Sequence, residues 1–235
     1  MFGAKKRRYL NQLGQGADAV TLFQTDPVRF MKSQVIIVGT SQAVNRAKGL
    51  YNMTLEAEDV AQCTLLEDGS ENYAFTLREA LGTEPSFSAF WCPYQQDGRK
   101  SVMIDRQADF VFTFTMDGCS LGLGSRTATG ARLVTHVNCA WAGDQAKKKG
   151  ATNAQCRLAQ AQAQLGQLQM KHHAPGLRAV IGPAQYMQEG VTLAATTVGI
   201  RKTKDNWNFY VQRYIPSSMM EMRRKLLDVV EVYKA

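Results

Sequence analysis

Much of the chemistry that usually identifies a protein from its sequence is missing from this chain. Its 235 residues include only five cysteines and three histidines. The cysteines are odd in number and show no C-x-x-C spacing, which excludes a complete disulfide framework and a zinc-knuckle pattern. The apolar run at residues 35–38 is too short for a signal peptide or a membrane span. We therefore expect a protein that works in a reducing cytosol with a free thiol and that, if exported, does not use the general secretory route.

Charge of one sign is in modest excess. The 28 Lys and Arg residues against 20 Asp and Glu residues give a net charge of +8, which favours contact with acidic surfaces. Apart from short basic runs at 5–8, 147–149 and 223–225 this excess is dispersed, and nucleic-acid motifs are missing, so we expect no nucleic-acid partner. The apolar fraction of 45% is ordinary for a globular protein. We expect one domain over residues 31–235, behind a flexible or loosely docked lead-in of residues 1–30.

The order of predicted elements favours an α+β fold with an antiparallel or mixed β-sandwich core flanked by helices. The clearest strand covers residues 109–116 and has Phe110, Phe112, Phe114 and Met116 on one face and Thr113 on the other. The next strand is predicted at 132–140. Further strands are predicted at 34–38, 87–94, 101–104, 191–201 and 207–214, with hairpin turns at 95–98 and 203–206.

Helices are predicted from apolar residues at helical spacing. One covers residues 41–51, and another runs through Leu77 and Leu81. A third covers 151–170 behind a cap at Thr152 and Asn153 and ends before Pro175 and Gly176, and a fourth follows a capping box from Ser218 to Glu221. The predicted buried faces are Ala154, Leu158, Ala161, Leu165 and Leu168 in the third helix, and Met222, Leu226, Val229 and Tyr233 in the fourth.

The most informative stretch is residues 113–119, Thr-Phe-Thr-Met-Asp-Gly-Cys, with His136 17 positions further on. It places the Cys119 thiol on a glycine turn at the end of one strand and an imidazole on the next. A cysteine is nucleophilic as the thiolate, which a neighbouring histidine stabilises at neutral pH. We expect residues 120–130, rich in Gly, Ser and Thr, to form the connection back to the next strand, with a flexible active-site loop at 122–125. The second strand then joins the same sheet and presents His136 to Cys119.

Thr113 is the candidate for a third role, because it faces away from the phenylalanine row and offers a hydroxyl or a backbone carbonyl to orient the imidazole. Backbone N–H groups at Gly118 and Cys119 are expected oxyanion donors, since a glycine turn exposes them. The substrate cleft is expected to include three further polar residues: Asp117, Ser120 and Asn138.

This arrangement resembles the deamidase fold shared by cytotoxic necrotizing factor catalytic domains, Burkholderia lethal factor and the chemoreceptor deamidase CheD. In those families a glycine-cysteine turn, commonly Leu-Ser-Gly-Cys, precedes a histidine by a dozen to about twenty residues. The latter two families also place a threonine six residues before the cysteine. The matching positions here are Gly118, Cys119, His136 and Thr113, and the chain departs from the pattern at Met116 and Asp117. The motif covers some 25 residues.

The resemblance implies that Cys119 attacks a Gln or Asn side chain of a target protein and that His136 transfers the protons, giving the acid through a thioester. No cofactor and no metal are implied. The family further implies a bacterial effector or toxin that leaves its cell by a non-Sec route, and we expect it to be a monomer. It would act in the target-cell cytoplasm on a small GTPase or another host protein.

Other interpretations stay open. A transglutaminase or a cysteine protease uses the same dyad, although papain-like proteases keep Cys and His much farther apart in sequence. A non-enzymatic basic binding module is the third alternative, because Trp207, Phe209 and Tyr210 lie across a hairpin from Arg201 and Lys202. Core packing is the expected role of Cys63, Cys92 and Cys156, and a polar helix end that of His172 and His173.

Overall fold

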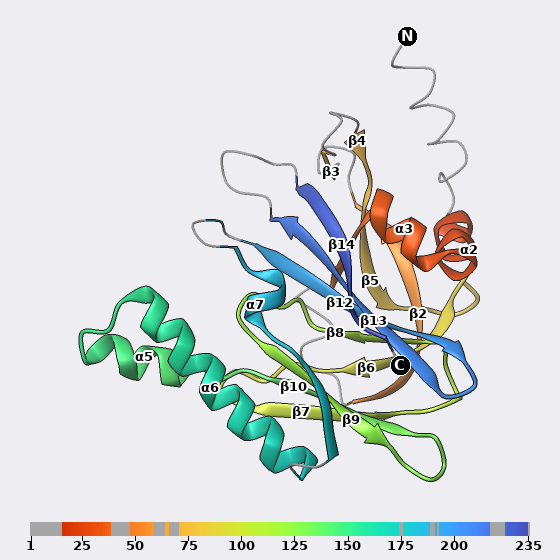
Figure 1. Ribbon diagram of the computed structural model, residues 1–235. Coiled ribbons are helices and arrows are strands. Elements are labelled where there is room, and N and C mark those ends of the chain that lie inside the picture. Colours follow the sequence, from red (N-terminus) through yellow and green to blue (C-terminus); the bar gives the residue numbers. More distant parts are fainter. Residues whose placement is uncertain are drawn as a thin grey trace.

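The computed structural model describes residues 16–38, 48–58, 64–65, 71–173, 176–188, 191, 193–216 and 224–234. Within these residues the strands form two sheets, one of ten strands and one of four, and helices pack against both (Figure 1). The larger sheet is mixed, with most neighbouring strands antiparallel. The predicted α+β class is therefore confirmed.

The large sheet has the order β1-β5-β2-β6-β8-β12-β13-β14-β3-β4. Its strands are β1 (Val35–Val38), β2 (Gly49–Ala57), β3 (Thr64–Leu65), β4 (Glu71–Asn72), β5 (Ala74–Glu79), β6 (Phe87–Cys92), β8 (Phe110–Thr113), β12 (Ala194–Thr203), β13 (Asn206–Ile215) and β14 (Lys225–Tyr233). The small sheet has the order β11-β9-β10-β7, built from β7 (Arg99–Ile104), β9 (Ser120–Arg126), β10 (Arg132–Val137) and β11 (Leu177–Ile181). The helices are α2 (Gly16–Thr25), α3 (Pro27–Ser33), α5 (Ala140–Lys148), α6 (Asn153–His172) and α7 (Pro183–Tyr186).

The large sheet curls until β1 approaches β12 and β13. The buried Gln212 side chain of β13 joins them, because its Oε1 accepts a hydrogen bond from the Ile36 N–H (2.8 Å) and its Nε2 donates to the Met31 carbonyl (2.6 Å). Thr196 Oγ1 on β12 donates to the Ile36 carbonyl at 2.7 Å. Buried polar groups need such partners, so these bonds fix the curl and make the sheet nearly barrel-shaped.

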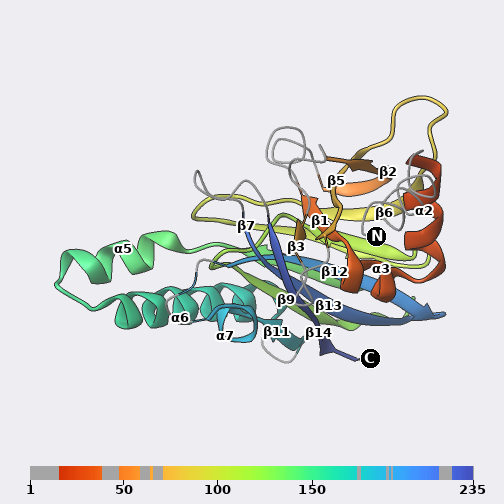
Figure 2. The ribbon, with the colours of Figure 1, turned by 90° about the horizontal axis from the view of Figure 1, so that it is seen from above.

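The first hydrophobic core lies between this sheet and helices α2 and α3 (Figure 2). Phe23 is its centre: it is fully buried, and its ring centroid lies 4.8 Å from that of Phe110 and 5.1 Å from that of Phe87. Ala19, Val20 and Phe30 belong to the same core, so the side chains described within the expected lead-in include residues packed against the sheet. Residues 1–15 lie outside the described part of the chain.

The second core lies between the two sheets. Leu121 and Val134 of the small sheet meet Val111 and Val211 of the large one there. The predicted alternation along β8 is confirmed, because Phe110 and Phe112 belong to the first core and Val111 to the second. Phe114 continues the row, since it packs against the first core, but Met116 lies in the second core instead.

Helix α6 covers the outer face of the small sheet, with α5 beside it (Figure 2). Thr152 caps it in a capping box with Gln155, as predicted. Its predicted buried face is confirmed at Leu168, which is fully buried, but wrong at Leu158 and Leu165, which are 59% and 42% exposed. The residues that α6 buries follow an i, i+4 row instead: Gln164, Leu168 and His172.

The segment expected as a flexible loop, residues 122–125, lies within strand β9 in the middle of the small sheet. Its glycines serve close packing: a Cβ at Gly122 would lie 2.5 Å from Leu168 Cδ2, and one at Gly124 would lie 2.9 Å from His172 Nδ1. The strands carrying Thr113 and His136 were expected in one sheet but lie in different sheets, β8 and β10. The predicted turn at 95–98 likewise joins two sheets, β6 to β7, and is not a hairpin.

Two predicted helices are strands. Leu77 lies in β5 and Leu226 in β14, where pairing with β2 and β13 overrides the helical spacing of their apolar neighbours. Residues 49–51 of the helix predicted at 41–51 belong to β2, and the capping box from Ser218 to Glu221 lies outside the described residues. The hairpin around 203–206 is confirmed as β12 and β13. None of the helices in the described ranges is both long and apolar enough to cross a membrane.

The position of Phe23 in the core predicts a large loss of stability on truncation. Phe23→Ala should lower the free energy of unfolding by about 3–5 kcal/mol, the usual cost of a buried phenylalanine. Leu22→Ala is the matched control, since Leu22 is 45% exposed and should cost under about 1 kcal/mol. Urea unfolding measures both. Equal small effects would show that α2 does not belong to the folded core.

Candidate functional site

Cys119 lies where the chain leaves a glycine turn and enters β9. Gly118 has a φ of 147°, a conformation that other residues rarely adopt, so the predicted sharp turn is present. The Cys119 side chain is fully buried in the core between the sheets. Alternation along β9 places Leu121 on the same face as Cys119 and Ser120 on the face toward α6.

The turn before the thiol is held from one side by Tyr186 at the end of α7. The Gly118 N–H donates to Tyr186 Oη at 3.0 Å, and the Tyr186 hydroxyl donates to the Cys119 carbonyl at 2.6 Å. Burial raises the Tyr186 pKa well above its usual value, so the phenol keeps the proton that it donates. One fully buried side chain thereby fixes the backbone on both sides of the Cys119 Cα.

Helix α6 holds the same turn from the other side. The Gly118 carbonyl accepts hydrogen bonds from Gln164 Nε2 at 2.7 Å and Gln160 Nε2 at 3.2 Å, two residues one helical turn apart. Ser120 Oγ donates to Gln164 Oε1 at 2.6 Å. The position of the thiol therefore depends on the docking of α6 against the small sheet.

His136 and Thr113 meet across the two sheets. His136 Nδ1 lies 2.5 Å from Thr113 Oγ1, and both side chains are 1% exposed. Of the two partners that the sequence offered for the imidazole, it is the hydroxyl that makes the contact. His136 Nε2 is buried and has no hydrogen-bond partner among the described residues. The imidazole is thus anchored through one nitrogen and has the other available for chemistry.

The thiol and the imidazole lie diagonally on neighbouring strands. The β9–β10 register pairs His136 with Leu121 and Val137 with Ser120, which puts Cys119 opposite Asn138. Diagonal neighbours on one face of an antiparallel pair are about 7–8 Å apart. Because His136 Nε2 has no partner among the described groups, the thiol and the imidazole are adjacent without a hydrogen bond in this state. Active-site hydrogen bonds are often formed only in the complex with substrate.

Asn138 is the direct polar partner of the thiol. Its Nδ2 donates to Cys119 Sγ at 3.3 Å, and its Oδ1 accepts from the backbone N–H groups of Asp97 (3.2 Å) and Ala140 (3.1 Å). These two acceptor contacts fix which end of the amide faces the sulfur. The 95–98 turn and the start of α5 therefore orient the amide group that points at Cys119.

Burial keeps both the thiol and the imidazole neutral. It raises the Cys119 pKa to about 12, although the Asn138 hydrogen bond opposes the shift, and it lowers the His136 pKa to about 3. Both shifts oppose transfer of the proton from the thiol to the imidazole in this closed site. The thiolate that the sequence analysis assumed is therefore not the resting form.

Tyr94 covers the imidazole. Its ring centroid lies 5.6 Å from that of His136 in an edge-on contact and 5.3 Å from that of Phe114. Partial burial raises the Tyr94 pKa, and the nearby Cys119 contributes to the shift. The half-buried Tyr94 is thus the side chain that separates the site from the surface on this side.

The predicted oxyanion and cleft residues have mixed outcomes. The Gly118 N–H is bonded to Tyr186, so it does not serve as a free oxyanion donor. Ser120 is buried against α6, on the opposite face of β9 from the thiol, and does not line a cleft. Asp117 is exposed beside the turn, and its backbone N–H approaches the Cys119 sulfur closely enough to lower the thiol pKa.

The remaining thiols and histidines fit packing roles. Cys92 is fully buried, and burial raises its pKa to about 12, whereas Cys156 is only partly buried. Cys63 lies outside the described residues. His172 is buried against β9, and no group of His, Cys, Asp and Glu in the described part of the chain could hold a metal ion.

Four residues that position the site were not predicted from the sequence: Tyr94, Gln160, Gln164 and Tyr186. Only the two glutamines could have been found from the sequence, because two amides one helical turn apart on the same side of a helix favour a polar contact there. Comparison with protein-family models found no match, and comparison with curated proteins found none either.

The neutral resting thiol predicts slow alkylation of Cys119. Its rate with iodoacetamide at pH 7 should fall well below that of a free cysteine and rise steadily to at least pH 10, because the reactive thiolate is scarce until the pKa of about 12. Mass spectrometry of peptides separates it from Cys156, the partly buried internal control. Rapid labelling of Cys119 that is independent of pH between 6 and 9 would show a preformed thiolate instead.

The buried imidazole predicts acid-sensitive stability. His136 binds its proton near pH 6.5 in the unfolded chain and near pH 3 in the fold, so stability is complete above pH 6.5 and declines as the pH falls toward 3. The slope from this residue is at most about 1.4 kcal/mol per pH unit. His136→Gln should flatten the curve of unfolding free energy against pH by about one proton. His172→Gln measures the separate contribution of the other buried histidine to the same curve. An unchanged slope of unfolding free energy against pH in His136→Gln would show that His136 is not the group that titrates.

Proposed function

We propose that the chain is a cysteine-dependent protein deamidase of the kind that its sequence motif resembles, with a related deamidase fold. The observation that carries the proposal is the contact between Thr113 Oγ1 and His136 Nδ1, with His136 on the same face and diagonal to Cys119. His172, a packing histidine, also has an unpartnered Nε2 among the described residues, so what distinguishes His136 is the Thr113 hydroxyl at Nδ1 and a thiol on the same face. A hydroxyl that anchors Nδ1 and leaves Nε2 open is the arrangement that a general base requires.

The residues divide the chemistry among them. Cys119 Sγ attacks the carboxamide carbon of a Gln or Asn side chain while its proton passes to His136 Nε2. The imidazolium returns that proton to the leaving nitrogen, so ammonia departs and a thioester remains. Water, deprotonated by His136, then hydrolyses the thioester to the free acid and restores the thiol. Thr113 keeps Nδ1 protonated through both steps by accepting its hydrogen bond.

Asn138 is the proposed oxyanion donor in place of Gly118. Its Nδ2 already points at the sulfur, and two backbone N–H groups hold its Oδ1, so the amide cannot turn away. When a carboxamide carbon bonds to the sulfur, its oxygen comes within reach of the same donor. The Asp117 N–H beside the sulfur is the second donor.

Substrate must open the site, because Cys119 is 0% exposed and the closed form resists proton transfer. Tyr94 is the proposed moving part, since it is half-buried and covers the imidazole. Tyr94→Ala should therefore raise the alkylation rate of Cys119 at pH 7 by about tenfold or more while the fold remains intact by circular dichroism. Phe114→Ala, which removes the stacking partner of Tyr94, should act in the same direction and more weakly. Unchanged rates in both variants would place the entrance elsewhere.

The proposed setting is a bacterial effector that leaves its cell by a non-Sec route and modifies a host protein in the target-cell cytoplasm. It depends on the family resemblance alone. A small GTPase or another protein with an exposed Gln or Asn is the proposed target class.

Mass spectrometry of a host-cell extract incubated with the protein tests the activity. Wild type should add about one dalton to particular Gln or Asn residues, and Cys119→Ala and His136→Ala should abolish the change. Thr113→Val should lower the rate about 10–100-fold, as loss of an orienting partner does. Cys156→Ser, away from the buried thiol, is the control and should keep full activity.

The same spectra separate the alternatives. A gain that matches an added amine would indicate a transglutaminase, and new chain ends would indicate a protease. Identical spectra for wild type and Cys119→Ala would contradict thiol catalysis on these targets and favour a non-enzymatic binding module.

A further inference from the structure

A cavity of about 330 Å³ lies at the end of β9 farthest from the thiol. Seven residues of extended chain separate Cys119 from Arg126, so the two sites are about 20 Å apart. Its lining is basic and polar, with no acidic side chain: Ser125, Arg126, Arg132, Arg178, Asn206 and Tyr233. The three arginines come from three adjacent strands, β9, β10 and β11.

The arginines are arranged unfavourably for a protein without a ligand there. Arg132 and Arg126 are direct partners in the β9–β10 register, and like charges directly opposite one another destabilise a sheet. The Asp205 carboxylate feels the charge of Arg126 but is bonded to Arg106 at 2.7 Å, the main reason for its lowered pKa. Arg126 itself donates to the neutral Asn206 Oδ1, at 3.3 Å.

Arg132 is the buried cation in the lining of the cavity. It is 4% exposed, yet no carboxylate of the described residues pairs with it: its Nη1 donates to the Gly124 carbonyl and to Tyr233 Oη, both at 3.0 Å. Its guanidinium also lies over the Tyr233 ring, 5.4 Å from the centroid. Its Nε has no hydrogen-bond partner among the described residues. A buried cation held only by neutral groups is costly, and an anion in the adjoining cavity would offset that cost.

We propose that this cavity binds the phosphate group of a small phosphate monoester. Guanidinium groups match phosphate oxygens with paired donors, and three of them neutralise a doubly charged anion. Tyr233 Oη accepts from Arg132 and keeps its own proton to donate, and Ser125 and Asn206 add neutral donors. The cavity is larger than a phosphate ion needs, which is why an ester with an organic part fits better than the free ion.

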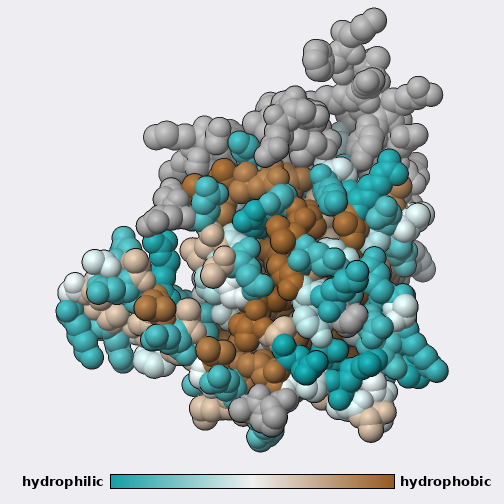
Figure 3. Space-filling model, in the orientation of Figure 1, coloured by the Kyte–Doolittle hydropathy of each residue, from teal (hydrophilic) through white to brown (hydrophobic). Residues whose placement is uncertain are grey.

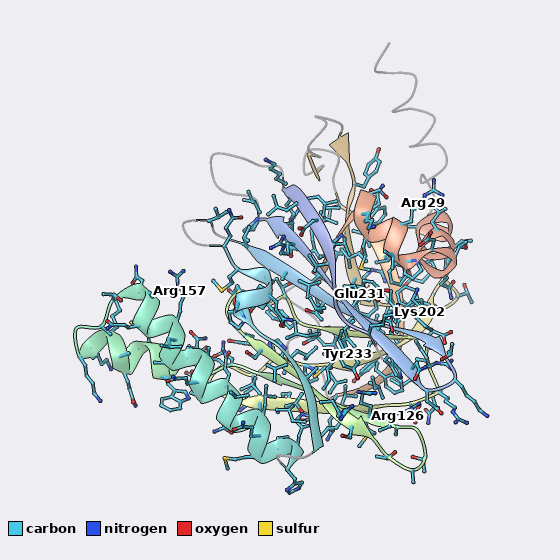
Figure 4. The ribbon with its side chains drawn as sticks, in the orientation of Figure 1. Arg29, Arg126, Arg157, Lys202, Glu231 and Tyr233 are labelled. Atoms are coloured by element: carbon cyan, nitrogen blue, oxygen red, sulfur yellow. The ribbon has the colours of Figure 1, made fainter. Side chains whose placement is uncertain are left out.

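The surface around the site suits such a ligand. Figure 3 shows hydrophobic side chains gathered over the middle of the face and hydrophilic ones over the end of β9 and the β12–β13 turn. Figure 4 shows Arg126 and Tyr233 on this side of the molecule and Arg157 on the distant α6. Arg126 and Arg178 are exposed, so they can close on a ligand from solvent while Arg132 forms the floor.

Titration calorimetry at constant ionic strength tests the proposal, with inorganic phosphate, glycerol phosphate, sulfate and citrate as probes. We expect saturable one-to-one binding, with glycerol phosphate at least as tight as inorganic phosphate and both at least tenfold tighter than citrate. Arg178→Ala and Arg126→Ala should each weaken glycerol phosphate at least tenfold. Arg157→Ala removes an exposed arginine of α6 and should change nothing.

Thermal unfolding with the same probes is the second measurement, since a ligand of the folded state raises the melting temperature with its concentration. Arg132→Lys keeps the charge and loses the paired donors, so it should retain the fold and lose most of this shift. Equal shifts of the melting temperature from all four anions, or equal shifts in wild type and Arg178→Ala, would show a nonspecific effect of ionic strength and overturn the proposal. Tighter binding of citrate, or of inorganic phosphate over its ester, would overturn the ligand class.

Discussion

Burial of an imidazole and a thiol between two sheets is the constraint on which the rest of the site depends. Thr113 comes from the large sheet and His136 from the small one, so their 2.5 Å contact exists only when the two sheets are packed together. The same packing removes water from Cys119 and moves the two pKa values in opposite directions. The site therefore forms only when the two sheets pack together. In this closed form the buried thiol and imidazole are both neutral.

Helices α6 and α7 fix the backbone of the turn that precedes Cys119. Tyr186 from α7 and the two glutamines of α6 take up both the N–H and the carbonyl of Gly118, leaving no freedom to the turn that precedes the thiol. Asn138 does the same for the sulfur itself, from the other strand. Under the proposed function, only the cover over the imidazole needs to move, which makes Tyr94 the proposed point of control.

The sequence predicted the motif better than its surroundings. The glycine turn, the Thr113 side of β8 and the strand that carries His136 follow from local rules of backbone sterics and alternation. The assignment of strands to two sheets does not, because it depends on contacts between distant residues. Glycines 122 and 124 were misinterpreted for that reason: they make room for Leu168 and His172, which are some fifty residues away in sequence. The buried face of α6 was likewise set by a sheet that its own apolar spacing could not reveal.

The protonation state of His136 is the most direct test of this account. Nitrogen NMR of the imidazole between pH 4 and pH 8 distinguishes neutral from charged rings and shows which nitrogen carries the proton. The account predicts a neutral ring throughout, protonated at Nδ1 toward Thr113, and a change of the pattern in Thr113→Val. A ring that titrates near pH 6.5, or one charged at pH 7 beside a Cys119 thiolate, would contradict it.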